Sequence, residues 1–177
     1  MHRRHHVLLA IGLTIAATAL STTPSPAMSK EERARLEHEI RSLDKDKVHK
    51  LVQSVEAQPF GDEADQVRAA LIVYFEPIPY EVCLDQIGFL MDAKPKLLMN
   101  VFWQVVLSSG DFYLQHPDES SDRLAYMQAG LEAGLRVYAR ILLEKPKARN
   151  AKLDELVEMS NAGRLGDYVR DNPCPKK

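Results

Sequence analysis

Apolar residues recur every three or four positions along most of this chain, and residues that start or end helices separate the runs. Ser29 precedes a run that includes Leu36 and Ile40. Asp44 or Asp46 would cap the next run, because short polar side chains accept hydrogen bonds from the first free N–H groups of a helix. We therefore expect an all-α single domain of seven or eight helices, either a compact bundle or a short superhelix of helix pairs.

Residues 70–75 read ALIVYF, which is the segment most similar to a β-strand. Its β-branched and aromatic residues favour strands. However, Val67, Leu71 and Tyr74 keep the spacing of one helix face, and the run continues a segment that opens at Asp62. The periodicity predicts a helix here.

The middle of the chain contains the most apolar runs. We expect a helix over 80–93, broken at Pro95, and the longest helix over about 121–144. The run 96–109 between them is apolar on nearly every face, which is typical of a central buried helix. Gly110 or the adjacent serines would end that helix.

The first residues have the pattern of a signal peptide. Arg3 and Arg4 precede an uncharged, mostly apolar run over 7–20, which is shorter than the roughly 18 residues of a membrane span. Small residues offer cleavage after Ala19 or after Ala27, and an uncleaved anchor is the alternative. We expect a signal peptide over 1–27, a helical domain over 28–177 and no stable membrane anchor.

Export changes the interpretation of the two cysteines, Cys83 and Cys174. In an oxidising compartment an even number of cysteines indicates pairing, and two cysteines allow only one intramolecular bond. We expect a disulfide between them that holds the C-terminal tail, with two free thiols or an intermolecular bridge as the alternatives. The periplasm is favoured over the extracellular medium because the chain lacks features of a free secreted enzyme.

The charge balance argues against a nucleic-acid partner. Once Arg3 and Arg4 are removed with the leader, 21 Lys and Arg remain against 25 Asp and Glu, so the net charge is near −4. The basic residues are scattered along the sequence, whereas non-specific binding to nucleic acid needs a basic face that neutralises phosphates.

Small residues form a stripe within the longest predicted helix. Ala125, Ala129 and Ala133 are spaced four apart, and Gly130 and Gly134 lie beside them. Small residues at this spacing allow a second helix to approach closely, which predicts a tight internal crossing. A groove that holds a partner or cargo is the alternative.

No metal, cofactor or catalytic motif is recognisable. The segment DKDKVHKL begins as a calcium loop at Asp44 and Asp46 but has Val48 and His49 where a ligand and a glycine are needed. His38 lacks the second histidine of a zinc-protease helix. We therefore expect neither a metal nor a cofactor, and a protein that is not an enzyme.

Three acidic residues near Cys83 leave one catalytic alternative open. Glu76, Glu81 and Asp85 are close in sequence, and Glu81 and Asp85 would share a helix face. Paired carboxylates can act as acid and base in a hydrolase. Such pairs are also common on ordinary surfaces, so we treat this as a minor alternative.

Aromatic residues followed by an acidic loop indicate a surface for a protein partner. Aromatic side chains are typical anchors of protein interfaces, and an acidic rim would suit a basic partner. The predicted partner-binding residues are Phe102, Trp103, Phe112, Tyr113, Asp118, Glu119 and Asp122. Core packing beside a solvated loop is the alternative.

Three short pieces of the chain together resemble a known family. They are Cys83, Gly88, Asp92 and Ala93, then Tyr113, Leu114, His116 and Pro117, and finally Pro173 and Cys174. In this arrangement the chain is similar to the periplasmic immunity proteins that protect bacteria against secreted wall-degrading toxins. The resemblance implies a non-catalytic inhibitor whose partner is a toxin enzyme; a periplasmic scaffold or carrier is the alternative.

Overall fold

The computed structural model describes residues 29–174, and the predicted signal peptide lies outside them. Within this range the chain forms eight α-helices and no strand, which confirms the all-α prediction. The α-helices are α1 (Lys30–Arg41), α2 (Lys45–Ala57), α3 (Asp62–Phe75), α4 (Leu84–Ile87), α5 (Met99–Gln115), α6 (Arg123–Glu144), α7 (Ala151–Asn161) and α8 (Leu165–Asp171). Short 3₁₀ turns are η1 (Gly88–Leu90), η2 (Lys96–Leu98), η3 (Pro117–Glu119) and η4 (Pro146–Ala148).

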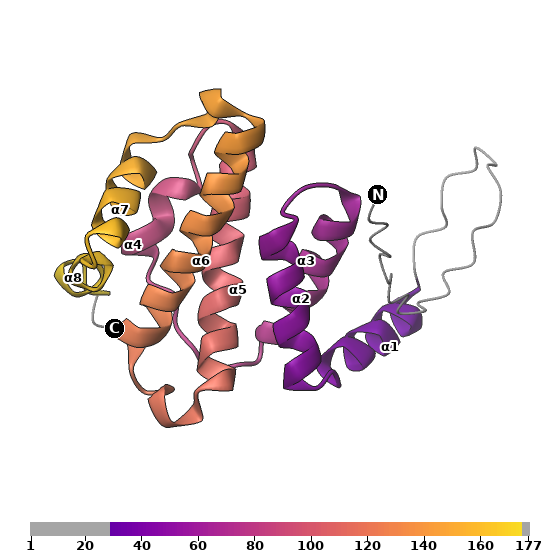
Figure 1. The fold of residues 1–177 in the computed structure, drawn as a ribbon. Helices are drawn as coiled ribbons and strands as arrows, with labels where there is room; N and C mark the ends of the chain where they lie inside the picture. The colour runs from indigo at the N-terminus through magenta and orange to yellow at the C-terminus, as the bar shows by residue number, and fades with distance from the viewer. Residues whose placement is uncertain (1–28, 175–177) are drawn as a thin grey trace, which may run out of the picture.

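The helices are arranged around α5 and α6, which lie side by side at the centre (Figure 1). Helices α4, α7 and α8 lie on one side of this pair, and α2 and α3 lie on the other. Helix α1 contacts α3 and projects away from the rest of the domain. Two groups of buried apolar side chains result, a larger one around α5 and α6 and a smaller one between α2, α3 and α5.

The predicted helix starts agree with the observed caps. The Ser29 hydroxyl accepts a hydrogen bond from the N–H of Glu32, whose carboxylate accepts one from the N–H of Ser29. Asp44 caps α2, and Asp122 caps α6 through the N–H groups of its first turn. These caps satisfy backbone donors that have no partner inside a helix.

The expected helix over 80–93 is wrong in extent. Residues 79–83 have no regular secondary structure, and only the short α4 and η1 follow. Pro77 and Pro79 lack the N–H groups that would continue a helix, so the chain leaves α3 as an irregular connection. Cys83 is therefore the residue before α4 and not part of a long central helix.

The predicted crossing at the small-residue stripe is present between α5 and α6. A methyl group added at Gly130 would lie 2.6 Å from the carbonyl oxygen of Val105, and one at Gly134 would lie 2.6 Å from a methyl of Val105. Ala133 is also buried. The helices are thus in contact along this stripe, and the open channel that a carrier would need there is not formed.

The C-terminal tail is held by the predicted cysteine pair and by side chains. The sulfur atoms of Cys83 and Cys174 lie at bonding distance, and their Cα atoms are 5.3 Å apart. The amide of Gln86 donates hydrogen bonds to the carbonyls of Val169 (2.9 Å) and Asn172 (2.8 Å). Tyr168 donates a third, to the carbonyl of Gln86. These hydrogen bonds add to the predicted disulfide in holding the tail.

None of the helices within residues 29–174 has the length and apolar character needed to cross a bilayer.

Replacing Gly130 with alanine should destabilise the domain. Alanine gains about 1 kcal/mol over glycine inside a helix, but its methyl group would overlap the backbone of α5, and overpacking costs about 1–3 kcal/mol. We expect a net loss of up to about 2 kcal/mol in the free energy of unfolding, measured by chemical denaturation. Gly88→Ala is the control, because an added methyl there meets no atom within 4 Å. Equal stability of the two variants would contradict the crossing.

Replacing Cys174 with serine should lower the free energy of unfolding by about 2–4 kcal/mol, because the bond restricts the unfolded chain. The side-chain bonds of Gln86 and Tyr168 remain, so helix content by circular dichroism should hardly change. Cleavage of the tail by protease should become faster. Two free thiols in the wild-type protein isolated from its native cells, detected by mass spectrometry without reduction, would refute the pairing.

Candidate protein-binding groove

An open apolar groove of about 300 Å³ lies between α3, α5 and the connection that follows α3. Eight of its nine lining residues are apolar or aromatic, and Glu76 is the one charged member. The lining residues are Ile72, Phe75, Glu76, Ile78, Tyr80, Val82, Trp103, Val106 and Leu107. A preformed apolar hollow with few polar groups is the usual form of a binding site.

The irregular connection after α3 forms one wall of this groove. It lays the Tyr80 ring against Phe75 (centroids 5.8 Å apart), Tyr113 (6.3 Å) and Tyr126 (6.5 Å). Burial raises the pKa of the Tyr80 hydroxyl far above its usual value, so the side chain remains neutral. These ring contacts hold the wall in place.

Gly110 allows the same wall to approach α5. A methyl group at Gly110 would lie 2.7 Å from the Phe75 ring and 2.8 Å from the Tyr80 ring. The expectation that Gly110 or the neighbouring serines end the helix is therefore wrong, since α5 continues to Gln115. This glycine serves close packing inside the helix and not a helix end.

Trp103 is the predicted partner-binding residue that lines the groove. Its ring is half-buried and packs edge-on against Phe102, with ring centroids 5.2 Å apart. Phe102 itself is buried in the main core. Ile72, which is 36% exposed, lines the groove as well. The groove thus offers aromatic and aliphatic surface to solvent.

The other predicted partner-binding residues lie elsewhere. Phe112 stacks on His116, with ring centroids 4.1 Å apart, and Tyr113 packs against Tyr126. Both are ten positions after Phe102 and Trp103 on α5, a rise of about 15 Å along the helix. The structure therefore divides the predicted aromatic surface into two parts.

The acidic residues predicted to form a rim follow Phe112 and Tyr113 in the chain, and not Trp103. Asp118 and Glu119 are exposed in η3, and Asp122 is occupied as the cap of α6. None of the three lines the groove near Trp103. Their role in partner binding stays a prediction.

The three carboxylates of the hydrolase alternative are exposed and point to different neighbours. Glu76 pairs with Arg41 (2.6 Å) and Glu81 with Arg123 (3.4 Å). Asp85 is exposed in α4. Glu76 lines the groove, and Glu81 and Asp85 do not.

A histidine–aspartate pair escaped the sequence analysis. Nδ1 of His49 in α2 lies 2.6 Å from a carboxylate oxygen of Asp111 in α5, and the amide of Gln53 lies 2.9 Å from its Nε2. Asp111 is only 7% exposed. Both ring nitrogens are therefore occupied, and the pair joins two helices. The sequence feature that could have revealed the pair is Asp111, the single charged residue in the run 97–115.

Metal ligands are not gathered anywhere in the part of the chain that the structure describes. Over residues 29–174, no group of three or more His, Cys, Asp or Glu side chains is placed to hold an ion.

Replacing His49 with alanine should lower the free energy of unfolding by about 1–3 kcal/mol, because the Asp111 carboxylate would lose its main hydrogen-bond donor while buried. The double variant His49→Ala/Asp111→Ala should recover part of this loss, since no buried charge then remains. Denaturant titration of the wild type, the two single variants and the double variant gives the coupling free energy between His49 and Asp111. Additive effects would show that the pair contributes nothing.

Comparison of the chain with protein-family models, with curated proteins and with solved structures found no match.

Proposed function

We propose that this domain is an exported, non-catalytic protein that binds another protein through the groove around Trp103. The observation that carries the proposal is a half-buried tryptophan in an open, almost entirely apolar groove. Tryptophan is among the residues that contribute most to protein interfaces when a partner covers it. Removing the exposed apolar lining from water on binding supplies the driving force.

Rigidity of the groove supports this assignment. Its walls are a helix, a second helix and a connection fixed by the edge-to-face contact of the Phe75 and Tyr80 rings over Gly110. A preformed site loses little conformational freedom on binding, so more of the contact energy appears as affinity.

We further propose that the partner is a toxin enzyme and that the protein acts as its immunity protein in the periplasm. This finer assignment rests on the resemblance in the segments around Cys83, Tyr113 and Cys174, and on the signal peptide predicted for 1–27. The inhibitor would cover the active site of the enzyme without chemistry of its own.

Two other functions are less well supported by the geometry. The carrier alternative required an open channel along the alanine and glycine stripe of α6, where Gly130 and Gly134 pack against α5. The hydrolase alternative required Glu76, Glu81 and Asp85 to share a cleft, and only Glu76 lines the groove.

Trp103→Ala should abolish partner capture from the native cells. We expect at least about a 30-fold loss of recovery, which corresponds to the roughly 2 kcal/mol of an interface hot spot. Leu84→Ala is the matched control, because it truncates an exposed apolar side chain that does not line the groove. Recovery is measured by gentle pull-down and mass spectrometry.

Ile72→Glu tests the same groove without altering the core, since Ile72 is partly exposed. For an immunity protein, the captured enzyme should be inhibited by the wild type and by Leu84→Ala but not by the two groove variants. Elution of the wild type alone, or equal loss in the control, would refute groove binding. A captured protein without enzymatic activity would refute the immunity role while leaving the binding role in place.

A further inference from the structure

Basic side chains that are scattered in the sequence gather at one end of the α5–α6 pair. Gly130 faces Val105 and Ser109, whereas Gly134 faces Val101 and Val105, so the two helices run in opposite directions. The start of α5 and the end of α6 therefore lie at the same end, where η2 also contacts α6. The basic end comprises Lys94, Lys96, Arg140, Lys145 and Lys147.

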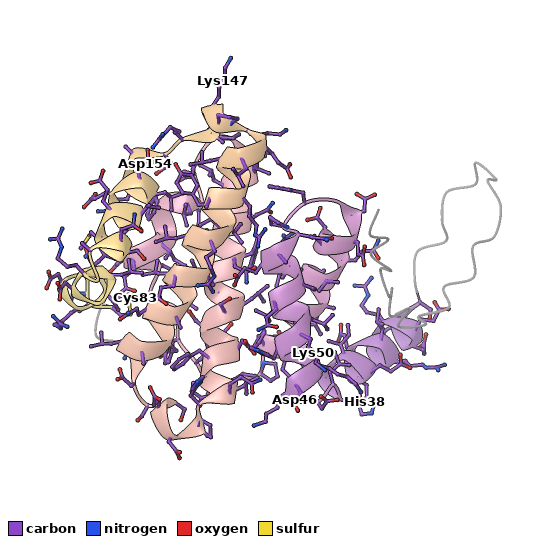
Figure 2. All side chains as sticks on the ribbon, in the orientation of Figure 1. His38, Asp46, Lys50, Cys83, Lys147 and Asp154 are labelled. Atoms are coloured by element: carbon purple, nitrogen blue, oxygen red, sulfur yellow. A yellow bond between two sulfur atoms is a disulfide. The ribbon has the colours of Figure 1, made fainter. Side chains whose placement is uncertain are left out.

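These five side chains are free to interact with something outside the chain. All five are exposed, and none forms an ion pair within residues 29–174. The acidic residues in the same segments are Asp92 and Glu144, so a positive excess remains. Figure 2 shows Lys147 projecting from the end of the domain. The predicted acidic residues of η3 lie at the opposite end of the pair.

The same end of α6 carries an exposed leucine. Leu143 is 84% exposed, more than any other large apolar side chain of the described residues. It stands in sequence between Arg140 and Lys145. Apolar side chains flanked by Lys and Arg are typical of proteins that rest on a membrane surface, where the leucine enters the boundary between headgroups and acyl chains.

The basic end is also held in shape. Ala148 of η4 is buried, and the Tyr138 hydroxyl accepts a hydrogen bond from the N–H of Asn150 (2.8 Å). The same hydroxyl donates to Asp154 (2.9 Å), which itself pairs with Arg149. The turn that carries Lys145 and Lys147 is thus fixed before any partner arrives.

We propose that the basic end docks reversibly on a bilayer that contains anionic phospholipid, with Leu143 inserted at the interface. The exposed leucine favours a lipid surface over nucleic acid, because it can insert between lipids. The five basic positions also include no aromatic side chain on which a base could stack. The five exposed, unpaired basic side chains give this end the positive charge that an anionic surface attracts. The proposal is independent of the groove around Trp103.

Vesicle flotation of the exported chain tests this docking. The probes are vesicles of phosphatidylcholine with phosphatidylglycerol, compared with vesicles of phosphatidylcholine alone. Mass spectrometry verifies that all protein variants have the same N-terminus. We expect binding to the anionic vesicles that weakens as salt is raised, since salt screens exposed charges. Lys145→Ala/Lys147→Ala should weaken binding by at least about tenfold, since each basic side chain contributes about fivefold.

The matched control is Lys45→Ala/Lys50→Ala, which removes the same charge from exposed, unpaired lysines of α2; Figure 2 shows Lys50 far from Lys147. Leu143→Ser should weaken binding severalfold at unchanged charge. Equal losses in both lysine pairs, equal binding to neutral vesicles, or no binding would overturn the proposal. So would lipid-independent self-association that the Lys145/Lys147 variant abolishes, because the basic end would then be occupied by a second copy.

Discussion

The close approach of α5 and α6 is the constraint on which the rest of the structure depends. Gly130 and Gly134 bring the α6 backbone against Val105 and Val101, so the two helices are in direct backbone contact and pack as one pair. On its remaining sides α5 receives α2 and the connection after α3, the latter over Gly110. A helix enclosed in this way has to be apolar on nearly every face, which explains the composition of its sequence.

The sequence predicted what local chemistry decides. Caps at Ser29 and Asp44 follow from short polar side chains before apolar runs, and the helical spacing across 70–75 outweighed its strand-forming composition. The glycine and alanine stripe correctly indicated a tight crossing, because glycine inside a helix is unfavourable unless packing requires it. All these features depend on residues close together in the chain.

The parts of the candidate site that sequence reasoning missed depend on contacts between distant residues. The groove exists because two prolines turn the chain out of α3 and lay Tyr80 across α5, and helical periodicity does not give the path of such a connection. His49 and Asp111 are 62 positions apart and meet only when α2 packs on α5. Of the predicted partner-binding residues, Trp103 lines the open groove, whereas its neighbour Phe102 is buried in the core. Partner binding by Trp103 stays a prediction.

The cysteine pair divides the chain into mechanically different parts. A bond between Cys83 and Cys174, 91 positions apart, closes a covalent ring that contains α4 to α8 and leaves α1 to α3 outside it. Tension applied between the two chain ends would pass through the sulfur atoms and bypass the ring. A pulling motor could therefore unfold α1 to α3 and the connection that follows, which would remove two of the three walls of the groove, while the α5–α6 pair stayed folded within the ring.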